Sequence, residues 1–504
     1  MTDRHSKAAV LFLFVAAIII LSAEAWIVRG FTVDDAYITF RYAQNFTAGN
    51  GLVFNAGSER TEGYSSLLWT LLVSVPHFVR IDAAVFAKVL GVTLTFLLLI
   101  ASSALGSLLA RDRGPGSAVL GGAAAAFIVA AYHATAVHAV SGMETTLCTL
   151  LLTTFVISAI RCAEQPAFVR CIAAAAAGLL LGLARPELNL VVIVTGAALL
   201  RDPRARRAVA VAFVVGYVIP GAVYFAARWR YYGLFLPLPF YVKGLHGRPL
   251  SGVKDVVWFV SEFVSRLGVM VLLGLAAGIT MPVVLVLAGI VPLMAFFMYP
   301  EPIMNFEWRY LQPTVPLFAA LAARGLMEMR AILSASNRWS RLALPLVLGL
   351  LALYAASDLR MARIAVRERT RYAAGLERAH VRLGLLLRDR AAAVPGGDPV
   401  LAIADAGAVP YLSGWRTIDT FGLNDVTIAT QGTHDPAQVF DEDPSLVVLL
   451  SLDREEFRPR LAWEADLFRA CEERGWRRAA VFEFDVDYYL WCMAPAGAAL
   501  ERRP

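Results

Sequence analysis

The stretch AAVLFLFVAAIIILSAEAW, residues 8–26, is apolar at every position except Ser22 and Glu24, and it follows the basic residues Arg4 and Lys7. A helix of about 20 such residues is long enough to cross the ~30 Å hydrocarbon core of a bilayer. The pattern of charges is that of a signal peptide, but the run is long for one and lacks a small-x-small cleavage site. We therefore expect a retained signal anchor at the start of a membrane protein.

Comparable apolar runs recur as far as Tyr354, whereas the sequence from Ser357 onward has the composition of a soluble protein. Of the 504 residues, 58% are apolar and 17% are charged, and the mean hydropathy is +0.61, which is outside the range of soluble proteins. The sequence predicts a polytopic α-helical membrane domain, residues 1–357, with about eleven spans, followed by a C-terminal α/β domain, residues 358–504. The expected spans are 8–28, 84–110, 116–137, 144–161, 171–184, 187–200, 208–228, 256–277, 281–299, 311–329 and 342–357.

Short loops between these spans hold many of the basic residues, at 111–113, 161–170, 201–207 and 330–341. Loops rich in Lys and Arg face the cytoplasm, so this pattern places the N-terminus there. The odd number of spans then places the first outer loop, 29–83, and the C-terminal domain on the far side of the cytoplasmic (inner) membrane. The same loops account for the net charge of +6, so no nucleic-acid partner is expected.

Two apolar segments are too short or too interrupted for simple spans. Residues 64–79 contain Pro76, and if they crossed the membrane the pattern of basic loops would invert. We expect them to form a re-entrant or interfacial helix covered by other protein. Residues 171–200 are split by Arg185-Pro186-Glu187, which predicts a broken pair of helices.

The C-terminal domain alternates apolar strands, expected at 399–404 and 446–450, with helices near 366–393 and 455–474. This order favours an α/β sandwich, and no Walker or Rossmann glycine pattern is present. Five cysteines are too few for a disulfide scaffold. Cys148, Cys162 and Cys171 are expected to pack as small apolar groups, and the spacing of Cys471 and Cys492 leaves their pairing open.

Two adjacent carboxylates, Asp34 and Asp35, follow the first span where the chain leaves the lipid. Acids so close to hydrocarbon are costly, although Asp is also common in solvated loops and at helix N-termini. The rest of the loop is dense in polar residues and punctuated by glycine, and it includes Arg41 and Tyr64. Such a segment is better suited to building a pocket than to joining two helices.

Residues 34–42, 49–55 and 62–66 together resemble the corresponding loop of the mycobacterial terminal arabinofuranosyltransferases, a family of GT-C membrane glycosyltransferases. Shorter similar patches follow at 141–145, 185–187, 240–243, 309–313, 405–411 and 418–425. The resemblance therefore extends over most of the chain. It implies an inverting transfer of a pentofuranose, such as arabinofuranose, from a polyprenyl-phosphate donor to an extracytoplasmic acceptor, which could be a glycan, a lipid or a protein such as pilin.

The resemblance also implies roles for the acidic pair. A sugar hydroxyl is a poor nucleophile near neutral pH, so a carboxylate must accept its proton, and we assign this role to Asp34. Asp35 would orient the acceptor, tune its neighbour electrostatically or help to hold a cation. Because paired carboxylates suit Mg²⁺ or Mn²⁺, metal binding by Asp34 and Asp35 stays open.

The lipid-phosphate leaving group needs cationic partners in a poorly solvated site. The candidates are Lys243, Arg185 and Arg309, although each could instead extend its charge toward lipid headgroups. His138 is expected to be structural. Residues expected to orient the acceptor or these cations are Arg41, Tyr64, Glu144, Glu187, Asp419 and Asn424, for some of which helix capping or a stable turn is the alternative.

Two other classes of protein are alternatives to a glycosyltransferase. A lipid-linked sugar transporter or flippase should carry charges along a path within the bilayer, whereas the spans here look nearly free of charge. A non-catalytic envelope-assembly protein needs no acidic pair at the membrane surface. Both alternatives are therefore less favoured than the enzyme.

Overall fold

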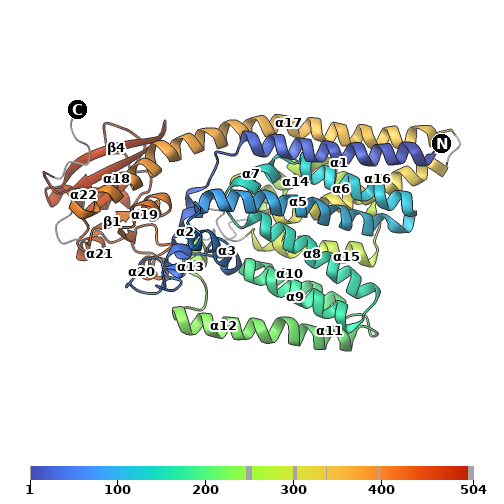
Figure 1. Ribbon diagram of the computed structural model, residues 1–504, viewed down its shortest axis with the longest axis horizontal. Coiled ribbons are helices and arrows are strands. Elements are labelled where there is room, and N and C mark those ends of the chain that lie inside the picture. The colour runs from blue at the N-terminus through green and yellow to red at the C-terminus, as the bar shows by residue number, and fades with distance from the viewer. Residues whose placement is uncertain (1, 246–252, 299–303, 336–337, 394–397, 498–504) are drawn as a thin grey trace.

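The computed structural model describes residues 2–245, 253–298, 304–335, 338–393 and 398–497. Long helices form a bundle, and a β-sheet lies beyond one end of it (Figure 1). The chain starts at the opposite end of the bundle with α1 (Thr2–Ile27). The other bundle helices are α5 (Ala83–Ala110), α6 (Pro115–Ala131), α7 (His133–Val140), α8 (Thr145–Glu164), α9 (Phe168–Ala184), α10 (Asn189–Leu199), α11 (Arg206–Phe213), α12 (Ile219–Tyr232), α14 (Val253–Gly274), α15 (Met281–Phe296), α16 (Val315–Ala335) and α17 (Ala343–Leu376).

Each of the eleven expected spans falls on one or more of these helices. Within the described residues, five helical segments are long and apolar enough to cross a membrane, or six if α6 and α7, which meet at a 65° bend, form one span. A π-helical turn, Val214–Val218, joins α11 to α12, and the resulting continuous helix, Arg206–Tyr232, is one of the five segments. Shorter apolar helices, including α9, α10 and α15, supplement them. The total of eleven crossings stays a prediction.

Small residues allow the central helices of the bundle to approach closely. A Cβ atom added to Gly106 on α5 would meet Ala125 and the backbone of Gly121 on α6, and one added to Gly122 would meet Ser103 and Ser107. Lipid tails are as apolar as the side chains, so helices in membranes associate mainly through such close packing. The α5–α6 contact is an example of this arrangement.

The two unusual segments are interrupted, as the sequence suggested. Residues 67–78 form two short helices, α3 (Leu67–Leu72) and α4 (Val75–Phe78), and the Ser66 hydroxyl caps α3 by accepting a hydrogen bond from the Trp69 N–H at 3.2 Å. Further along the chain, α9 ends at Ala184, and a single 3₁₀ turn separates it from α10. Both breaks lie at the end of the bundle that faces the sheet (Figure 1).

The C-terminal part of the chain, residues 377–497, contains a five-stranded sheet of order β2-β1-β3-β5-β4. The strands are β1 (Val400–Ile403), β2 (Arg416–Asp419), β3 (Leu446–Ser451), β4 (Arg477–Asp485) and β5 (Tyr488–Ala494). β1 pairs in parallel with β2 and β3, whereas β5 runs antiparallel to β3 and β4. Strands β1 and β3 match the two strands expected from the sequence.

Helices cover both faces of this sheet. Leu401, Ile403 and Val448 pack against the end of α17 and α18 (Arg382–Arg390), whereas Ala402 and Val447 pack toward α22 (Glu464–Glu473). Three short helices complete the C-terminal part, α19 (Ala408–Ser413), α20 (Val426–Gln431) and α21 (Pro436–Asp441).

The five cysteines form no disulfide among the described residues. Cys471 and Cys492 are buried in separate hydrophobic clusters, which lie on opposite faces of the sheet. Cys162 on α8 and Cys171 on α9 come together instead, with their Sγ atoms 2.7 Å apart. This contact joins two helices and was not expected from the sequence.

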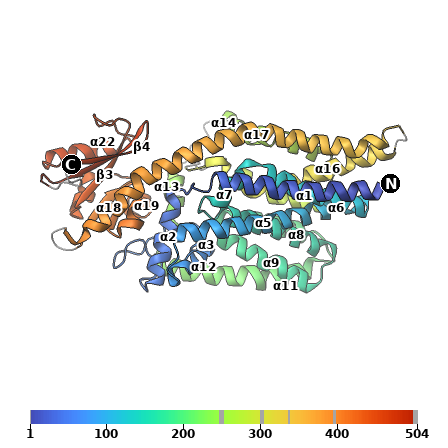
Figure 2. The same cartoon turned by 45° about the horizontal axis from the view of Figure 1, so that its top comes forward.

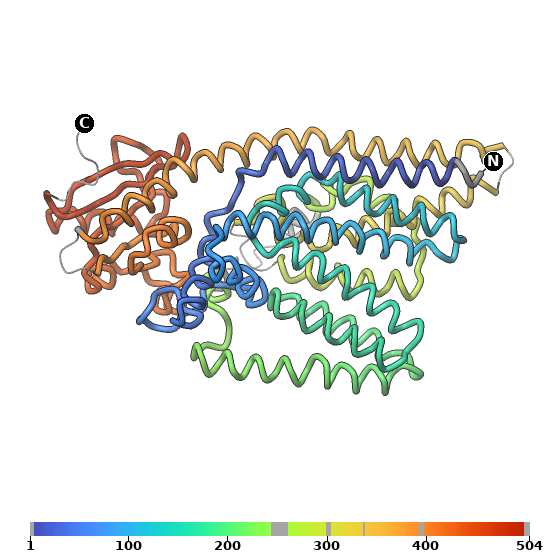
Figure 3. Tube along the Cα trace, viewed as in Figure 1, coloured from blue at the N-terminus to red at the C-terminus, as the bar shows by residue number. Residues whose placement is uncertain are grey.

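Helix α17 connects the two parts of the molecule without a break. Its 34 residues run along α1 and continue past the end of the bundle to the sheet (Figures 1 and 3). Helix α2 (Asp34–Thr47) lies at the same end of the bundle, next to the C-terminal part, as the turned view also shows (Figure 2). The first outer loop and the sheet therefore meet.

Candidate active site

An acidic cavity of about 160 Å³ lies where α2 meets the sheet. Asp405 is the second residue after β1 and therefore stands at the carboxyl edge of the parallel strands, where open α/β sheets place their ligand sites. Side chains from α2, the end of α17 and the C-terminal part close the cavity. Its lining residues are Asp34, Asp35, Ile38, Met304, Tyr372, His380, Ala404, Asp405, Ala406, Phe421, Leu423, Phe484 and Tyr488.

Asp34 is the first residue of α2 and is held from three directions. Its Oδ1 atom accepts a hydrogen bond from the backbone N–H of Ala408 at 2.8 Å, and its own N–H donates to the Tyr372 hydroxyl at 3.1 Å. Gly407 packs so tightly against it that a Cβ atom there would overlap both the carboxylate and the carbonyl of Asp34. These contacts bury Asp34 to 8% exposure.

Burial raises the pKa of Asp34 to about 7, because the charged form loses water. The charge of His380 opposes this shift, and the charge of Asp405 adds to it. A carboxyl group with this pKa can accept and release a proton near neutral pH, which is the property that general-base catalysis requires.

Behind Asp34 lies a hydrogen-bonded group formed by the C-terminal part. His380 Nε2 is 2.8 Å from Asp405 Oδ2, and the Tyr488 hydroxyl donates to the same oxygen. Burial opposes the charge on both residues. The hydrogen bond and opposite charge of the partner nevertheless hold the pKa of His380 above, and that of Asp405 below, its ordinary value. Sequence reasoning missed this group, although an Asp immediately after an apolar strand was a usable signal for Asp405.

Asp35 differs from its neighbour. It is half-buried, lines the same cavity and interacts electrostatically with Arg309. The structure therefore separates the acidic pair into a buried, tightly bonded Asp34 and a more exposed Asp35. In the described part of the chain, no three His, Cys, Asp or Glu side chains are arranged to hold a metal ion.

The predicted donor-binding arginines form a second cluster with the two predicted glutamates. Arg185 pairs with Glu187 at 2.5 Å and with Glu144 at 3.1 Å, and its guanidinium lies 4.9 Å from the ring centroid of Tyr310. Arg309 is 4% exposed and donates to the Tyr310 hydroxyl at 3.0 Å. The two arginines thus share one aromatic ring.

The two arginines differ in how their charges are satisfied. Two carboxylates neutralise Arg185, whereas the Nε and Nη1 atoms of Arg309 are buried and have no hydrogen-bond partner among the described residues. Unmade hydrogen bonds of a buried charged group are costly, so these two donors indicate a missing anionic ligand. Lys243 lies on α13 (Leu238–Leu245), but its side chain is outside the described residues.

Of the other predicted residues, Arg41 and Tyr64 form hydrogen bonds within the protein. Arg41 donates to the carbonyls of Phe54 and Trp415, both at 2.7 Å, and to that of Pro410. These bonds fasten α2 to its own loop and to the C-terminal part. The Tyr64 hydroxyl shares a hydrogen bond with that of Tyr232 at 3.0 Å.

Asp419 and Asn424 shape the loop that follows β2. The Asp419 carboxylate accepts hydrogen bonds from the N–H groups of Phe421, Gly422 and Asn424, and from the Asn424 side chain at 2.8 Å. The Asn424 oxygen accepts from Tyr42 on α2 at 3.0 Å. Phe421 from this loop lines the acidic cavity, whereas Asp419 and Asn424 line a polar cleft of about 510 Å³ on its other side.

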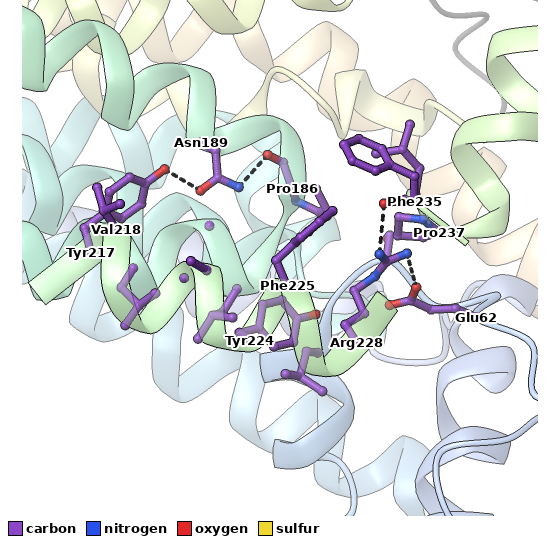
Figure 4. A pocket seen from close by; sticks show the side chains of 18 residues that line it. Glu62, Pro186, Asn189, Tyr217, Val218, Tyr224, Phe225, Arg228, Phe235 and Pro237 are labelled. Carbon is purple, nitrogen blue, oxygen red and sulfur yellow. Dashed lines mark hydrogen bonds and ion pairs between the residues drawn. The ribbon is translucent and has the colours of Figure 1, made fainter. Parts of the chain in front are cut away.

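An apolar groove of about 370 Å³ runs between α9 and α12 (Figure 4). At its polar end Arg228 pairs with Glu62 at 2.6 Å and donates to the Phe235 carbonyl at 2.9 Å. Its wall includes Pro186, the neighbour of Arg185. Arg185 of the arginine cluster therefore directly precedes a lining residue of the groove. The role of Arg228 was not predictable from the sequence, in which it ends the expected span 208–228.

A buried ionisable cluster joins the bundle to the turn before Arg309, and of its three residues His133, Asp358 and Glu307 only His133 lies within a predicted span. His133 on α7 bonds to Asp358 on α17, with Nδ1 2.9 Å from Oδ2. His133 Nε2 lies 3.1 Å from the Glu307 carboxylate. His138, expected to be structural, is buried with its Nε2 3.1 Å from the Glu307 carbonyl.

The chain thus combines a helical bundle, an outer loop that begins with an acidic pair and an appended sheet. The chain superposes on ArnT from Cupriavidus metallidurans bound to undecaprenyl phosphate with a TM-score of 0.60 and 13% identity, over 98% of this chain and 99% of that chain. For the same protein in the apo state the TM-score is 0.56 and the identity 11%, over 94% and 97%. The Archaeoglobus fulgidus oligosaccharyltransferase in its apo form gives a TM-score of 0.54 at 11% identity, over 86% of this chain and 69% of that chain.

At these identities the similarity establishes the fold. The prediction of a polytopic helical membrane protein with a GT-C-like fold is thereby confirmed. Residues 365–498 match a family described only as a domain of unknown function (DUF8728). No curated protein matches the chain.

Proposed function

We propose that the protein is a membrane glycosyltransferase that moves a sugar from a polyprenyl-phosphate donor to an acceptor outside the cytoplasm, with inversion. One observation carries the proposal. A buried carboxylate with a pKa of about 7 lies in the same site as Asp35, and Asp35 interacts with an arginine whose buried donors have no partner in the described part of the chain. These are the two groups that the reaction needs, a base for the acceptor and a cation for the departing phosphate.

In this proposal an acceptor hydroxyl oxygen attacks the anomeric carbon of the donor while its proton passes to Asp34. The bond between the anomeric carbon and the phosphate oxygen breaks, and the oxygen leaves with the electron pair. The N–H groups of Arg309 stabilise the negative charge that develops there. Asp35 orients the acceptor or the donor sugar, and the His380–Asp405 pair sets the charge around Asp34.

The apolar groove suits the isoprenoid chain of the donor. Leu179, Leu183 and Phe225 line it, and nearby side chains of α12 such as Val223 face outward, where lipid surrounds the bundle. A lipid chain bound in the groove with its phosphate next to Pro186 would place that phosphate near Arg185 and Arg309. The likeness of residues 34–66 to arabinofuranosyltransferases supports a pentofuranose such as arabinofuranose as the sugar, and a glycan, a lipid or a protein such as pilin as the acceptor.

The decisive experiment uses the purified protein in lipid with a labelled polyprenyl-phosphate arabinofuranose and a cell-envelope fraction as acceptor. We expect the label to become covalently attached to the acceptor as polyprenyl phosphate is released. A transporter would move the intact donor between the leaflets of a vesicle and form no product. A non-catalytic assembly protein would do neither, so either of these results would contradict the proposal.

The proposed sidedness places the site in the periplasm or its equivalent. Figure 1 shows the N-terminus, the α5–α6 connection and the α10–α11 connection at one end of the bundle, opposite the sheet. These two connections hold Arg111, Arg113 and the four arginines of residues 201–207. A reporter fused to the C-terminus should therefore be active only outside the cytoplasm, and one inserted at Arg204 only inside. A cytoplasmic signal from the C-terminal fusion would refute this topology.

A further inference from the structure

The turn that carries Arg309 has a strained backbone. Glu307 and Trp308, two successive residues with Cβ atoms, adopt positive φ angles of 45° and 54°. Left-handed conformations are unfavourable for such residues, and they persist only where the surrounding structure enforces them. Some other part of the protein must therefore hold this turn in place.

The described contacts identify helix α7 as the element that holds it. The Glu307 carboxylate lies 3.1 Å from His133 Nε2, and the Glu307 carbonyl lies 3.1 Å from His138 Nε2. One helix thus bonds both the side chain and the backbone of a strained residue. The Glu307 side chain is only 9% exposed, so water competes little for these bonds.

His133 is itself fixed by α17. Its Nδ1 atom lies 2.9 Å from Asp358 Oδ2, and its backbone N–H donates to the same oxygen at 2.9 Å. The carboxylate thereby sets the orientation of the imidazole ring, and because the other ring nitrogen also faces a carboxylate, both nitrogens must donate, as in the imidazolium form. Asp358, His133 and Glu307 form a continuous buried chain from α17 to the turn.

We propose that Glu307, held by His133 and Asp358, is a positioning residue that fixes Arg309 for the phosphate of the lipid donor. The inference rests on the proposed function and extends it, because it explains how two buried guanidinium donors have no partner among the described residues. Arg309 follows Glu307 by two residues, and the locked turn prevents its guanidinium from moving to a protein acceptor. The site thus keeps its donors ready for an anion.

The test measures binding of undecaprenyl phosphate to the full-length protein in nanodiscs. Arg309→Ala and Glu307→Ala should each weaken binding by about tenfold or more, since each removes or misplaces a charged partner of the phosphate. The double variant should bind no more weakly than Arg309→Ala alone, because Glu307 acts only through Arg309. Glu307→Gln, which keeps a hydrogen-bond acceptor for His133, should recover most of the affinity.

Glu328→Ala is the matched control. Glu328 lies on α16, the helix that follows the Arg309 turn, and pairs with Arg324 at 2.5 Å and Arg113 at 2.6 Å. Its removal also breaks ion pairs of the bundle, but these lie near the other end of α16. We expect a lower temperature of unfolding with unchanged affinity for undecaprenyl phosphate.

The possible failures are distinguishable. Unchanged binding by Arg309→Ala would overturn the donor role in the proposed function. Weak binding by Arg309→Ala with normal binding by Glu307→Ala, or with additive losses in the double variant, would overturn only the positioning role. If Glu307→Ala does not fold, His133→Gln takes its place, and normal affinity in that variant would equally contradict the inference.

Discussion

Asp34→Asn is expected to reduce transfer by ~10²–10⁴-fold while the protein still folds and inserts, because the change removes the proton acceptor and keeps the shape. The amide oxygen of Asn can still accept the hydrogen bond from Ala408 N–H that Asp34 accepts at 2.8 Å. The measurement is the rate of covalent transfer from labelled polyprenyl-phosphate sugar. Asp389→Asn serves as control, since Asp389 is an exposed acid on α18 far from the cavity lining.

The pH dependence of the parent enzyme provides a second measure of the same base. The pKa of Asp34 is raised to about 7, so the ionised form that accepts a proton prevails above this pH and is lost as the pH falls through it. The transfer rate should therefore rise with pH through about 7. A rate for Asp34→Asn within a few-fold of the parent would reject the assignment, and the base would then be sought at Asp35 and next at Glu144.

Gly407→Ala is expected to lower transfer by ~10²-fold without changing any charge, because small displacements of a catalytic group have effects of this size. The added Cβ atom would overlap the carboxylate and the carbonyl of Asp34, and one of the two segments would have to move. The effect should appear mainly in kcat, with affinity for undecaprenyl phosphate preserved, since Gly407 lies beside the base.

Gly349→Ala is the control for this substitution. Gly349 is on α17, and no atom lies within 4 Å of the position that its Cβ would take. Its replacement should leave transfer and the temperature of unfolding nearly unchanged. Full activity in Gly407→Ala would show that the contact between the C-terminal part and Asp34 has no bearing on catalysis.

The membrane helices were predictable from the sequence because burial in lipid demands long apolar segments, and each expected span falls on a helix. The break at Pro186 was predictable for a local reason, since proline has no N–H to continue a helix. The bend between α6 and α7 was not foreseen, because Tyr132 and His133 carry no comparable signal. The partners across the bundle were likewise hidden, as nothing in the sequence pairs His133 with Asp358.

For the candidate site, the sequence pointed to Asp34 because an acidic pair directly after a span is unusual. It also identified Arg185 and Arg309, which the structure places around Tyr310. The surroundings of Asp34 could not be predicted, because His380 and Ala408 are more than 300 residues away along the chain. They come together only because α2 contacts the carboxyl edge of the sheet. That contact depends on the tertiary packing of the first outer loop against the C-terminal part.

Because α17 is unbroken, it fixes the spacing between the residue that anchors the arginine turn and the residue that contacts the proposed base. Asp358, which anchors the arginine turn through His133, and Tyr372, which accepts a hydrogen bond from Asp34, lie on this one helix. At about 1.5 Å per residue they are roughly 21 Å apart along its axis and face nearly the same side. Inserting a single residue between them would rotate one relative to the other by about 100°. The length of this segment is therefore as constrained as the identity of the residues at its two ends.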